Sequence, residues 1–347
     1  MYVYIASYFF LLFYSPLLLV INWKYSILST RLLFFIGLLP AILLVGLRGD
    51  VGTDTENYLQ MAGNFLNGSD ITYEDLHVEI GFFWLLKLLV FFTEDPRLVI
   101  NFISFLITLY CFVLFSKKAE NILIFSLLIF PVFFYDMSMN GLRYGLAFLL
   151  AKHASDKLDS NKRLSSLALI SISLSLQVSG LLVLFLLQVR RLRFINIIYL
   201  APLLALLFVA FQDHLASKFL SYGIFESPNA TSGLWPLAIF LACYLCLFLA
   251  DLAFCKRFFF LFVAEVLAFL LARVTYAGLR FQLLILFVFF CYISTIQLQE
   301  YKRGKLIICL FLIVGLFGFV GTLKNFLNNF DVPPSPFLPY HFFYEIN

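Results

Sequence analysis

The chain has 347 residues, of which 63% are hydrophobic and 13% are charged, and its formal net charge at pH 7 is +4. Soluble domains are about half apolar and about a quarter charged, so this composition excludes an ordinary soluble globule. Apolar runs recur along the whole sequence and predict an all-α polytopic integral membrane protein, with a single transmembrane domain over residues 1–347. We therefore expect the protein to lie in a lipid bilayer, and we expect no nucleic-acid partner.

The first apolar run is the N-terminal MYVYIASYFFLLFYSPLLLVIN. It lacks a basic n-region and a small-residue cleavage site, so it predicts a first membrane span and not a removable signal peptide. In chain order, the apolar windows predict spans over 2–21, 31–47, 98–115, 121–136, 140–154, 194–211, 233–250, 258–273, 280–298 and 305–323. With shorter segments, the total is about 10–13 transmembrane helices.

Three apolar segments are too short for the ~20 residues that a crossing needs. Segments 164–176 and 178–188 predict the arms of a hairpin that is broken around LQVSG. Segment 79–93 carries Lys87 at its centre and predicts an interfacial or re-entrant helix.

Basic residues set the orientation, because cytoplasmic loops collect Lys and Arg. Most of the 24 basic residues fall on one side, which is therefore cytoplasmic: Lys24, Arg31, Lys117, Lys118, Lys152, Lys157, Lys162, Arg163, Arg190, Arg191, Arg193, Lys256, Arg257, Lys302, Arg303 and Lys305. This assignment requires that segment 79–93 does not cross the membrane.

The opposite side receives the outer loop 48–97, a second outer loop 212–232 and the C-terminal tail 324–347, and it holds most of the 20 acidic residues. Four arginines at or near helix ends oppose the orientation rule by facing outward: Arg48, Arg143, Arg273 and Arg280. Charges at a membrane edge are costly and tend to mark ligand pathways, so each of the four is a candidate binding residue.

The decapeptide RGDVGTDTEN, residues 48–57, is the first polar motif. A helix that began at Thr53 or Asp54 would gain an N-cap and acidic residues in its first turn. Capping alone does not account for Arg48 beside Asp50, nor for the two glycines, so a capped turn and a functional site both remain open.

The stretch MNGLRYGLAFLLAKH, residues 139–153, opens a helix from the outer surface with Asn140 and Arg143. The Arg143 guanidinium either snorkels to the headgroups or faces the bundle interior and binds phosphate bidentately.

The stretch LARVTYAGLRFQLL, residues 271–284, places Tyr276 between Arg273 and Arg280. A continuous helix would put all three on one face, whereas a turn near residues 277–278 would point both arginines at one vestibule. Two cations near one cavity favour a diphosphate ligand, and interfacial anchoring is the alternative.

Three further features carry less weight. The hairpin break at Gln177 indicates a cavity, because broken helices at membrane depth occur where they line one or are buried in protein. The tail DVPPSPFLPYHFFYEIN either packs back on the outer face or is loose. Cys243 and Cys246 have no nearby Cys or His partner and are expected to be buried small hydrophobes. We expect no metal and no cofactor.

These pieces, in this order, resemble the EpsG-type branch of the Wzy polysaccharide polymerases. The resemblance is carried by Arg48 with Val51-Gly52-Thr53-Asp54 and Tyr58, by Glu79-Ile80-Gly81-Phe82, by Asn140, Leu142, Arg143 and Ala147, and by the broken hairpin Leu176-Gln177-Val178-Ser179. In the hairpin, the family's usual histidine is replaced by Gln177, which can hydrogen-bond a sugar but cannot titrate. The match is good over residues 45–190 and loose elsewhere.

The resemblance implies a helical bundle like those of the C-type glycosyltransferases (GT-C), in the bacterial inner membrane, with an active site that faces the periplasm. Such enzymes use two undecaprenyl-diphosphate-linked oligosaccharides as donor and acceptor. The growing glycan is transferred to a non-reducing-end sugar hydroxyl of the incoming repeat unit. A chain-length-regulating membrane protein is a further partner that it suggests. O-antigen, capsule and exopolysaccharide remain open as products.

This chemistry needs cations for the leaving diphosphate and a polar partner for the acceptor hydroxyl. The candidates for the diphosphate are Arg143, Arg273, Arg280 and Arg48. The catalytic candidates that orient or deprotonate the acceptor are Asp54, Asp50, Glu79 and His77, of which Asp54 leads through its motif. The candidates for the sugar are Asn140, Gln177, Tyr276 and Tyr58. We expect metal-independent transfer, with arginines in the role that Mg²⁺ has elsewhere.

Three other classes compete. An O-antigen ligase-like glycosyltransferase usually has one large outer loop with a histidine, and loop 212–232 is modest. A transporter or flippase of lipid-linked oligosaccharide should show a polar through-path and a repeat, and neither is visible here. A membrane O-acyltransferase would need a histidine in a buried helix, whereas His153 lies among lysines near the cytoplasmic end.

Overall fold

The computed structural model describes residues 1–22, 27–68, 72–73, 76, 78–189, 232–298, 303–328 and 337–345. These residues form two compact units. The first comprises Met1–Leu182, Ser294–Gln297 and Leu312–Asn347, and the second comprises Val183–Ile293 and Leu298–Phe311. The predicted span 194–211 and nearly all of the predicted outer loop 212–232 lie outside the described residues.

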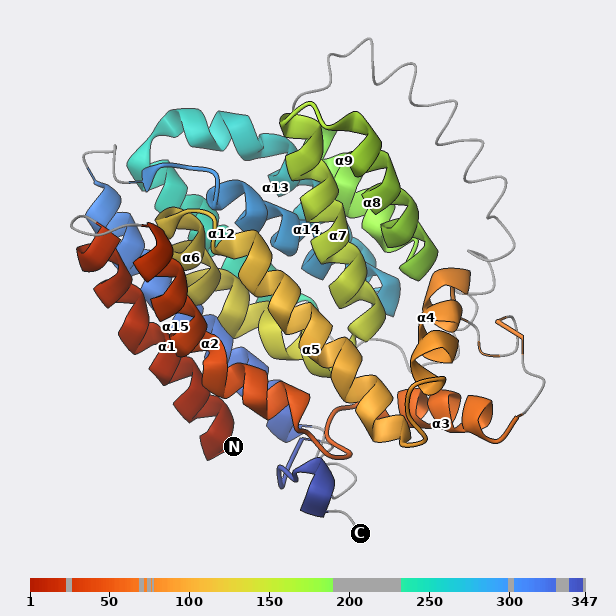
Figure 1. Ribbon diagram of the computed structural model, residues 1–347. Helices are drawn as coiled ribbons and strands as arrows, with labels where there is room; N and C mark the ends of the chain where they lie inside the picture. Colours follow the sequence, from red (N-terminus) through yellow and green to blue (C-terminus); the bar gives the residue numbers. More distant parts are fainter. Residues whose placement is uncertain are drawn as a thin grey trace, which may run out of the picture. The chain divides into compact units, whose positions relative to one another are not determined.

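Helices make up nearly all of the described chain (Figure 1). The helices up to the hairpin are α1 (Tyr2–Asn22), α2 (Ile27–Gly46), α3 (Thr55–Leu66), α4 (Ile80–Val90), α5 (Pro96–Phe115), α6 (Ala119–Ile124), the π-helices η1 (Phe125–Phe134) and η2 (Asp136–Asn140), α7 (Leu142–Asp159) and α8 (Arg163–Leu176). The later helices are α9 (Ser179–Val189), α12 (Leu234–Ala250), α13 (Leu252–Ala272), α14 (Tyr276–Ile293), α15 (Gly304–Asn328) and the short η5 (Phe343–Glu345).

The fold class predicted from the sequence, an all-α polytopic membrane protein, is confirmed. Three helices of the described chain are long and apolar enough to cross a membrane, namely Pro96–Phe115, Tyr276–Ile293 and Gly304–Leu327, and several shorter apolar helices accompany them. The broken hairpin is present as α8 and α9, which meet at Gln177. Helix α15 continues to Asn328, so residues 324–328 are helical and do not belong to the tail.

Local signals explain where several helices begin. The Asp95 carboxylate accepts a hydrogen bond from the backbone N–H of Arg97 at 2.8 Å, and Pro96 occupies the first turn of α5. Asp251 caps α13 in the same way through the N–H of Ala253, at 2.9 Å. Each side chain satisfies a backbone donor that a helix start leaves open.

The sequence did not predict the π-helices between α6 and α7, where it indicated plain spans over 121–136 and 140–154. Pro131 lies inside η1 and has no N–H to donate, which disfavours regular α-helical pairing there. The carbonyl of Pro131 accepts a hydrogen bond from the hydroxyl of Thr322 in α15, at 2.9 Å. Wide turns of this kind occur often at functional sites, and η2 leads directly into α7.

Helix α4 has 11 residues and therefore rises about 16 Å, against a hydrocarbon core of about 30 Å. It is too short to cross a membrane alone, in keeping with an interfacial or re-entrant placement of segment 79–93. Phe82 and Leu86 are buried, whereas Trp84 and Leu88 are exposed.

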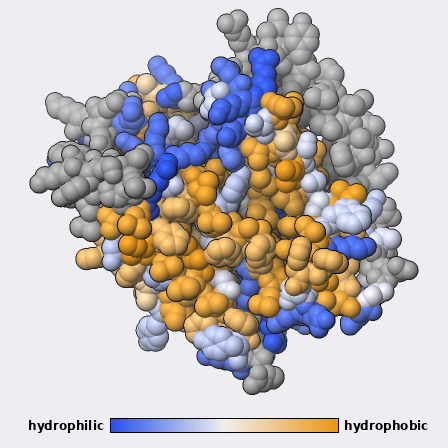
Figure 2. Space-filling model, viewed as in Figure 1, coloured by the Kyte–Doolittle hydropathy of each residue, from blue (hydrophilic) through white to orange (hydrophobic). Residues whose placement is uncertain are grey.

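The face shown in Figure 2 carries a broad area of apolar side chains over α1, α2 and α5. The exposed apolar residues of these helices include Phe9, Phe13, Leu32, Leu39, Leu43, Phe102, Phe105 and Leu109. So large an exposed apolar surface suits contact with lipid. Within the same unit, α3 runs at a steep angle to α5 (Figure 1).

Candidate functional site

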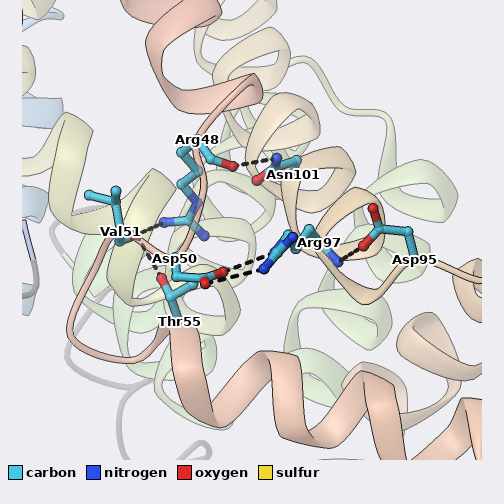
Figure 3. A network of polar contacts seen from close by, with 7 residues as sticks. All are labelled: Arg48, Asp50, Val51, Thr55, Asp95, Arg97 and Asn101. Carbon is cyan, nitrogen blue, oxygen red and sulfur yellow. Dashed lines mark hydrogen bonds and ion pairs between the residues drawn. The ribbon is translucent and has the colours of Figure 1, made fainter. Parts of the chain in front are cut away.

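The loop between α2 and α3 is held against the end of η2 by Arg48, whose side chain is fully buried. Its Nη1 donates to the carbonyl of Val51 at 3.2 Å, and its own carbonyl accepts from Asn101 Nδ2 at 2.8 Å (Figure 3). The same Nη1 also donates to the carbonyl of Met139. Its Nε and Nη2 are buried and have no hydrogen-bond partner among the described residues. Burial lowers the pKa of Arg48 to about 10, so the guanidinium remains charged at neutral pH.

Gly52 brings this loop into contact with the start of the MNGLR motif. Its φ is +123°, and a Cβ there would lie 2.6 Å from Thr55 Oγ1 and 2.9 Å from the Met139 carbonyl oxygen. The next residue, Thr53, donates its backbone N–H to Asn140 Oδ1 at 3.0 Å. Glycine is therefore required at position 52, both by the backbone conformation and by the close contact between the RGDVGTDTEN and MNGLR motifs.

Asp54 occupies the N-cap position of α3, as the sequence suggested, but its side chain forms no capping hydrogen bond. At the start of α3, the backbone N–H of Thr55 donates to the Gly52 carbonyl at 3.2 Å, and the Thr55 hydroxyl donates to the Val51 carbonyl at 2.8 Å (Figure 3). The Asp54 carboxyl group is thus not needed for the cap, and the capping explanation loses its main support.

Asp50 forms an ion pair with Arg97 at the start of α5. Its carboxylate accepts from Arg97 Nε at 3.1 Å and from Nη2 at 3.4 Å (Figure 3). The two side chains are 45% and 28% exposed, so the pair lies at the surface. Asp50 therefore links the loop to α5.

Arg143, in the first turn of α7, joins the second and third motifs. Its Nη1 donates to Glu79 Oε2 at 3.0 Å, its guanidinium lies 5.9 Å from the ring centroid of Phe82, and it is hydrogen-bonded to the Tyr58 side chain. The Glu79 side chain is only 6% exposed, whereas that of Arg143 is 26% exposed. Burial raises the pKa of Tyr58, so its phenol stays protonated at neutral pH.

Asp136 is a site residue that the sequence reasoning missed. Its Oδ1 accepts from Asn140 Nδ2 at 3.1 Å, and its Oδ2 accepts from the Tyr144 hydroxyl. It therefore orients the amide of Asn140 beside the loop. The sequence did offer one signal for this contact: Asp136 precedes Asn140 by four residues, about one helical turn, so the two side chains can lie on the same face of a helix.

The hairpin that breaks at Gln177 packs against α4 and α7. Ser173 of α8 donates its hydroxyl to the Ala147 carbonyl of α7 at 2.8 Å. Gly81 of α4 lies so close to Ser175 that a Cβ there would overlap it. Gln177 follows Ser175 by two residues, and this places the break next to α4 and α7. His77 lies outside the described residues.

The second unit holds the remaining candidates. Helix α13 ends at Ala272 and α14 begins at Tyr276, so Arg273 and Arg280 stand on the two sides of a turn and not on one continuous helix. The Arg273 guanidinium lies 4.5 Å from the ring centroid of Phe269. The turn occupies residues 273–275, slightly earlier than the predicted 277–278.

The described part of the tail packs back on the chain and is not loose. Gly49 donates its N–H to the His341 carbonyl at 2.8 Å, and Phe343 donates to the Leu47 carbonyl at 3.0 Å. The Tyr340 hydroxyl donates to the Leu44 carbonyl at 2.5 Å. These contacts fix the tail beside the segment that carries Arg48. Cys243 and Cys246 are buried, as expected.

The fold and these contacts define a multi-pass helical membrane protein with a charged cluster at the start of α7. A family model, described as the EpsG family, matches residues 31–342. The chain therefore belongs to the EpsG family, and the resemblance drawn from its motifs is confirmed. This membership supports a role of the polysaccharide-polymerase kind in general terms. No match was found among curated proteins or among solved structures.

Proposed function

We propose that this protein is a Wzy-type polymerase of lipid-linked polysaccharide repeat units. It transfers the growing glycan from undecaprenyl diphosphate to a non-reducing-end hydroxyl of an incoming undecaprenyl-diphosphate-linked unit. The observation that carries the proposal is the Arg143–Glu79 ion pair, which is joined to Tyr58 and lies beside the docked loop 48–55.

In the proposed reaction, the bond between the donor's anomeric carbon and the diphosphate oxygen breaks, and the diphosphate leaves with the electron pair. The acceptor oxygen forms the new bond to that carbon, and its proton passes to a carboxylate. Negative charge grows on the leaving diphosphate, so preorganised cations there lower the barrier most. Arg143, Arg273 and Arg280 are the candidates, and the buried Arg48 is a fourth.

Arg143 suits this role because it is partly exposed and already binds a carboxylate. A guanidinium can bind a phosphate bidentately, and a phosphate that displaced Glu79 would free that carboxylate to orient or deprotonate the acceptor hydroxyl. Asp54 is the other candidate base, since its side chain does not cap α3. Asp50 is less suited because it is paired with Arg97.

Charges at the two ends of α5 and α7 favour a periplasmic site in the bacterial inner membrane. Both helices begin near the loop that carries Asp50. At their other ends, Asp156 is paired with Lys152 and, at 3.3 Å, with Lys117. Clustered lysines mark a cytoplasmic end, so the Arg143 cluster would face the opposite compartment.

The test replaces Arg143, Arg273 or Arg280 by Ala, confirms membrane insertion, and examines the surface polysaccharide on a gel. Arg163→Ala is the matched control, because Arg163 is exposed at the start of α8. We expect each of the three variants to lose the long-chain ladder and the control to keep it. A normal ladder from all three would refute the assignment of these arginines to the substrate diphosphate.

A further inference from the structure

A buried carboxyl group in the second unit has no part in the proposed chemistry. Glu265 of α13 and Gln282 of α14 are both 0% exposed. Gln282 Nε2 donates to Glu265 Oε1 at 3.0 Å and to the carbonyl of Gly233 at 3.0 Å. Because Gly233 immediately precedes α12, one amide group joins three helices.

Two oxygens of this cluster, Glu265 Oε2 and Gln282 Oε1, are buried and find no hydrogen-bond partner within the described part of the chain. A carboxylate and an amide oxygen can only accept hydrogen bonds, so an ionised Glu265 leaves both unsatisfied. A proton on Glu265 Oε2 makes that atom a donor, and Gln282 Oε1 is the acceptor on the neighbour it already contacts. A proton shared between these two oxygens would satisfy both atoms.

The surroundings also disfavour the ionised form. Among the residues that the structure describes, no cation is within ion-pair distance of Glu265. An isolated buried charge is far more costly than a buried neutral group that is hydrogen-bonded. The geometry thus favours a neutral carboxylic acid at this position.

The same cluster adjoins the turn between α13 and α14, which begins at Arg273 and precedes Arg280 of α14. Gly233 has φ +77°, and a Cβ there would overlap Gln282 Oε1 and lie 3.1 Å from Ala272 Cβ. Ala272 is the residue before Arg273. The amide of Gln282, the backbone of Gly233 and the end of α13 are therefore in one packed group.

Helix α14 is held to α13 at a second point within this group. A Cβ on Gly278 would lie 2.5 Å from Ala272 Cα, so the two helices touch backbone to backbone there. Arg280 lies between Gly278 and Gln282 on α14. Its position relative to Arg273 is consequently fixed by the contact at Gly278 and by the pair at Gln282.

We propose that Glu265 is permanently protonated and forms a cyclic acid–amide pair with Gln282, and that this pair positions Arg273 and Arg280. The positioning part rests on the proposed function, since it assigns those arginines to the substrate diphosphate. The protonation part does not rest on it. Glu265 and Gln282 are positioning residues in this scheme, and neither touches substrate.

The experiment compares Glu265→Gln and Glu265→Ala in the full-length protein, with Glu94→Gln as the matched control because Glu94 is exposed. Each purified protein is examined by infrared spectroscopy in H₂O and D₂O for the carbonyl band of a protonated carboxyl group. Each variant is also tested for chain extension of lipid-diphosphate-linked repeat units and for a monodisperse size-exclusion peak.

We expect the protonated-carboxyl band in the wild type and in Glu94→Gln, and its loss in both Glu265 variants. Glu265→Gln should keep chain extension within about two-fold, because an amide can make the same two hydrogen bonds. Glu265→Ala should lose about ten-fold or more, because it removes the hydrogen-bond partner of Gln282 on α13 and leaves a cavity in the buried cluster.

Three results would overturn the inference in separable ways. A wild type without a Glu265-dependent band would refute the protonation. Glu265→Gln as inactive as Glu265→Ala would show that an amide cannot replace the carboxyl group and would refute the hydrogen-bonding role, and full activity of Glu265→Ala would refute the positioning role. A wild type that shows the band but extends no chain would instead refute the proposed function and leave the acid–amide pair supported.

Discussion

Replacement of Gly52 by Ala should damage the docked loop more than its size suggests. The positive φ at Gly52 costs an L-residue about 1–3 kcal/mol. Overpacking against Thr55, Met139 and Asn140 adds about 1–3 kcal/mol, because the new Cβ would lie 2.6, 2.9 and 3.0 Å from their oxygens. We therefore expect Gly52→Ala to lower the free energy of unfolding by about 2–6 kcal/mol.

Two other glycines separate these contributions. Gly68 has φ +67°, and a Cβ there would meet no described atom within 4 Å, so Gly68→Ala reports the backbone cost alone, about 1–2 kcal/mol. Gly63 lies inside α3, where a Cβ would also meet no described atom within 4 Å, so Gly63→Ala should stabilise by about 0.5–1 kcal/mol.

Denaturant unfolding in detergent micelles, followed by circular dichroism, gives the three free energies, and the polysaccharide ladder reports function. Loss of the ladder in Gly52→Ala at a temperature where the protein is still folded would show that the contact with Asn140 matters for activity. If Gly52→Ala were no more destabilising than Gly68→Ala, the packing argument for this loop would be wrong.

Four further experiments address the charged residues and the metal independence. Arg143→Ala should reduce folded yield because the buried Glu79 carboxylate loses its ion pair with Arg143, whereas the double variant with Glu79→Gln should recover the yield but not the ladder. Asp54→Asn should not reduce thermal stability through loss of a cap, because the carboxylate does not cap α3, and it should abolish chain extension if Asp54 is the base. Asp50→Asn should cost at most about 1 kcal/mol, falling with added salt, because its pair with Arg97 is exposed. Chain extension by the purified protein should persist in EDTA; its loss, with recovery on adding Mg²⁺, would refute metal-independent transfer.

Helix positions were predictable because long apolar runs and caps are local features of the sequence. The predicted segments 98–115 and 305–323 correspond to α5 and α15 within a few residues. The π-helices were not predicted: Pro131 marks an irregular helix, but it does not specify the wider π-helical pairing, and its contact with Thr322 of α15 is distant in sequence.

For the site, the sequence named most of the residues that meet in the first unit but not their pairings. Spacing cannot show that Arg143 pairs with Glu79, or that Asp50 pairs with Arg97, because each pair is separated by many residues. Asp136 was missed for a different reason: its partners Asn140 and Tyr144 are only four and eight residues away, but an acidic residue at that spacing does not by itself indicate a contact.

The packing of residues 337–345 has a practical consequence for handling the protein. The Gly49 and Phe343 hydrogen bonds tie this segment to the chain immediately around Arg48, and an isolated β-bridge pairs Arg48 with Phe342. An affinity tag or fluorescent fusion placed after residue 347 would therefore lie close in sequence to the segment that packs against the RGDVGTDTEN loop. A purification tag is better inserted in a loop that adjoins the ends of α5 and α7 near the Lys117–Asp156 ion pair, away from the RGDVGTDTEN loop.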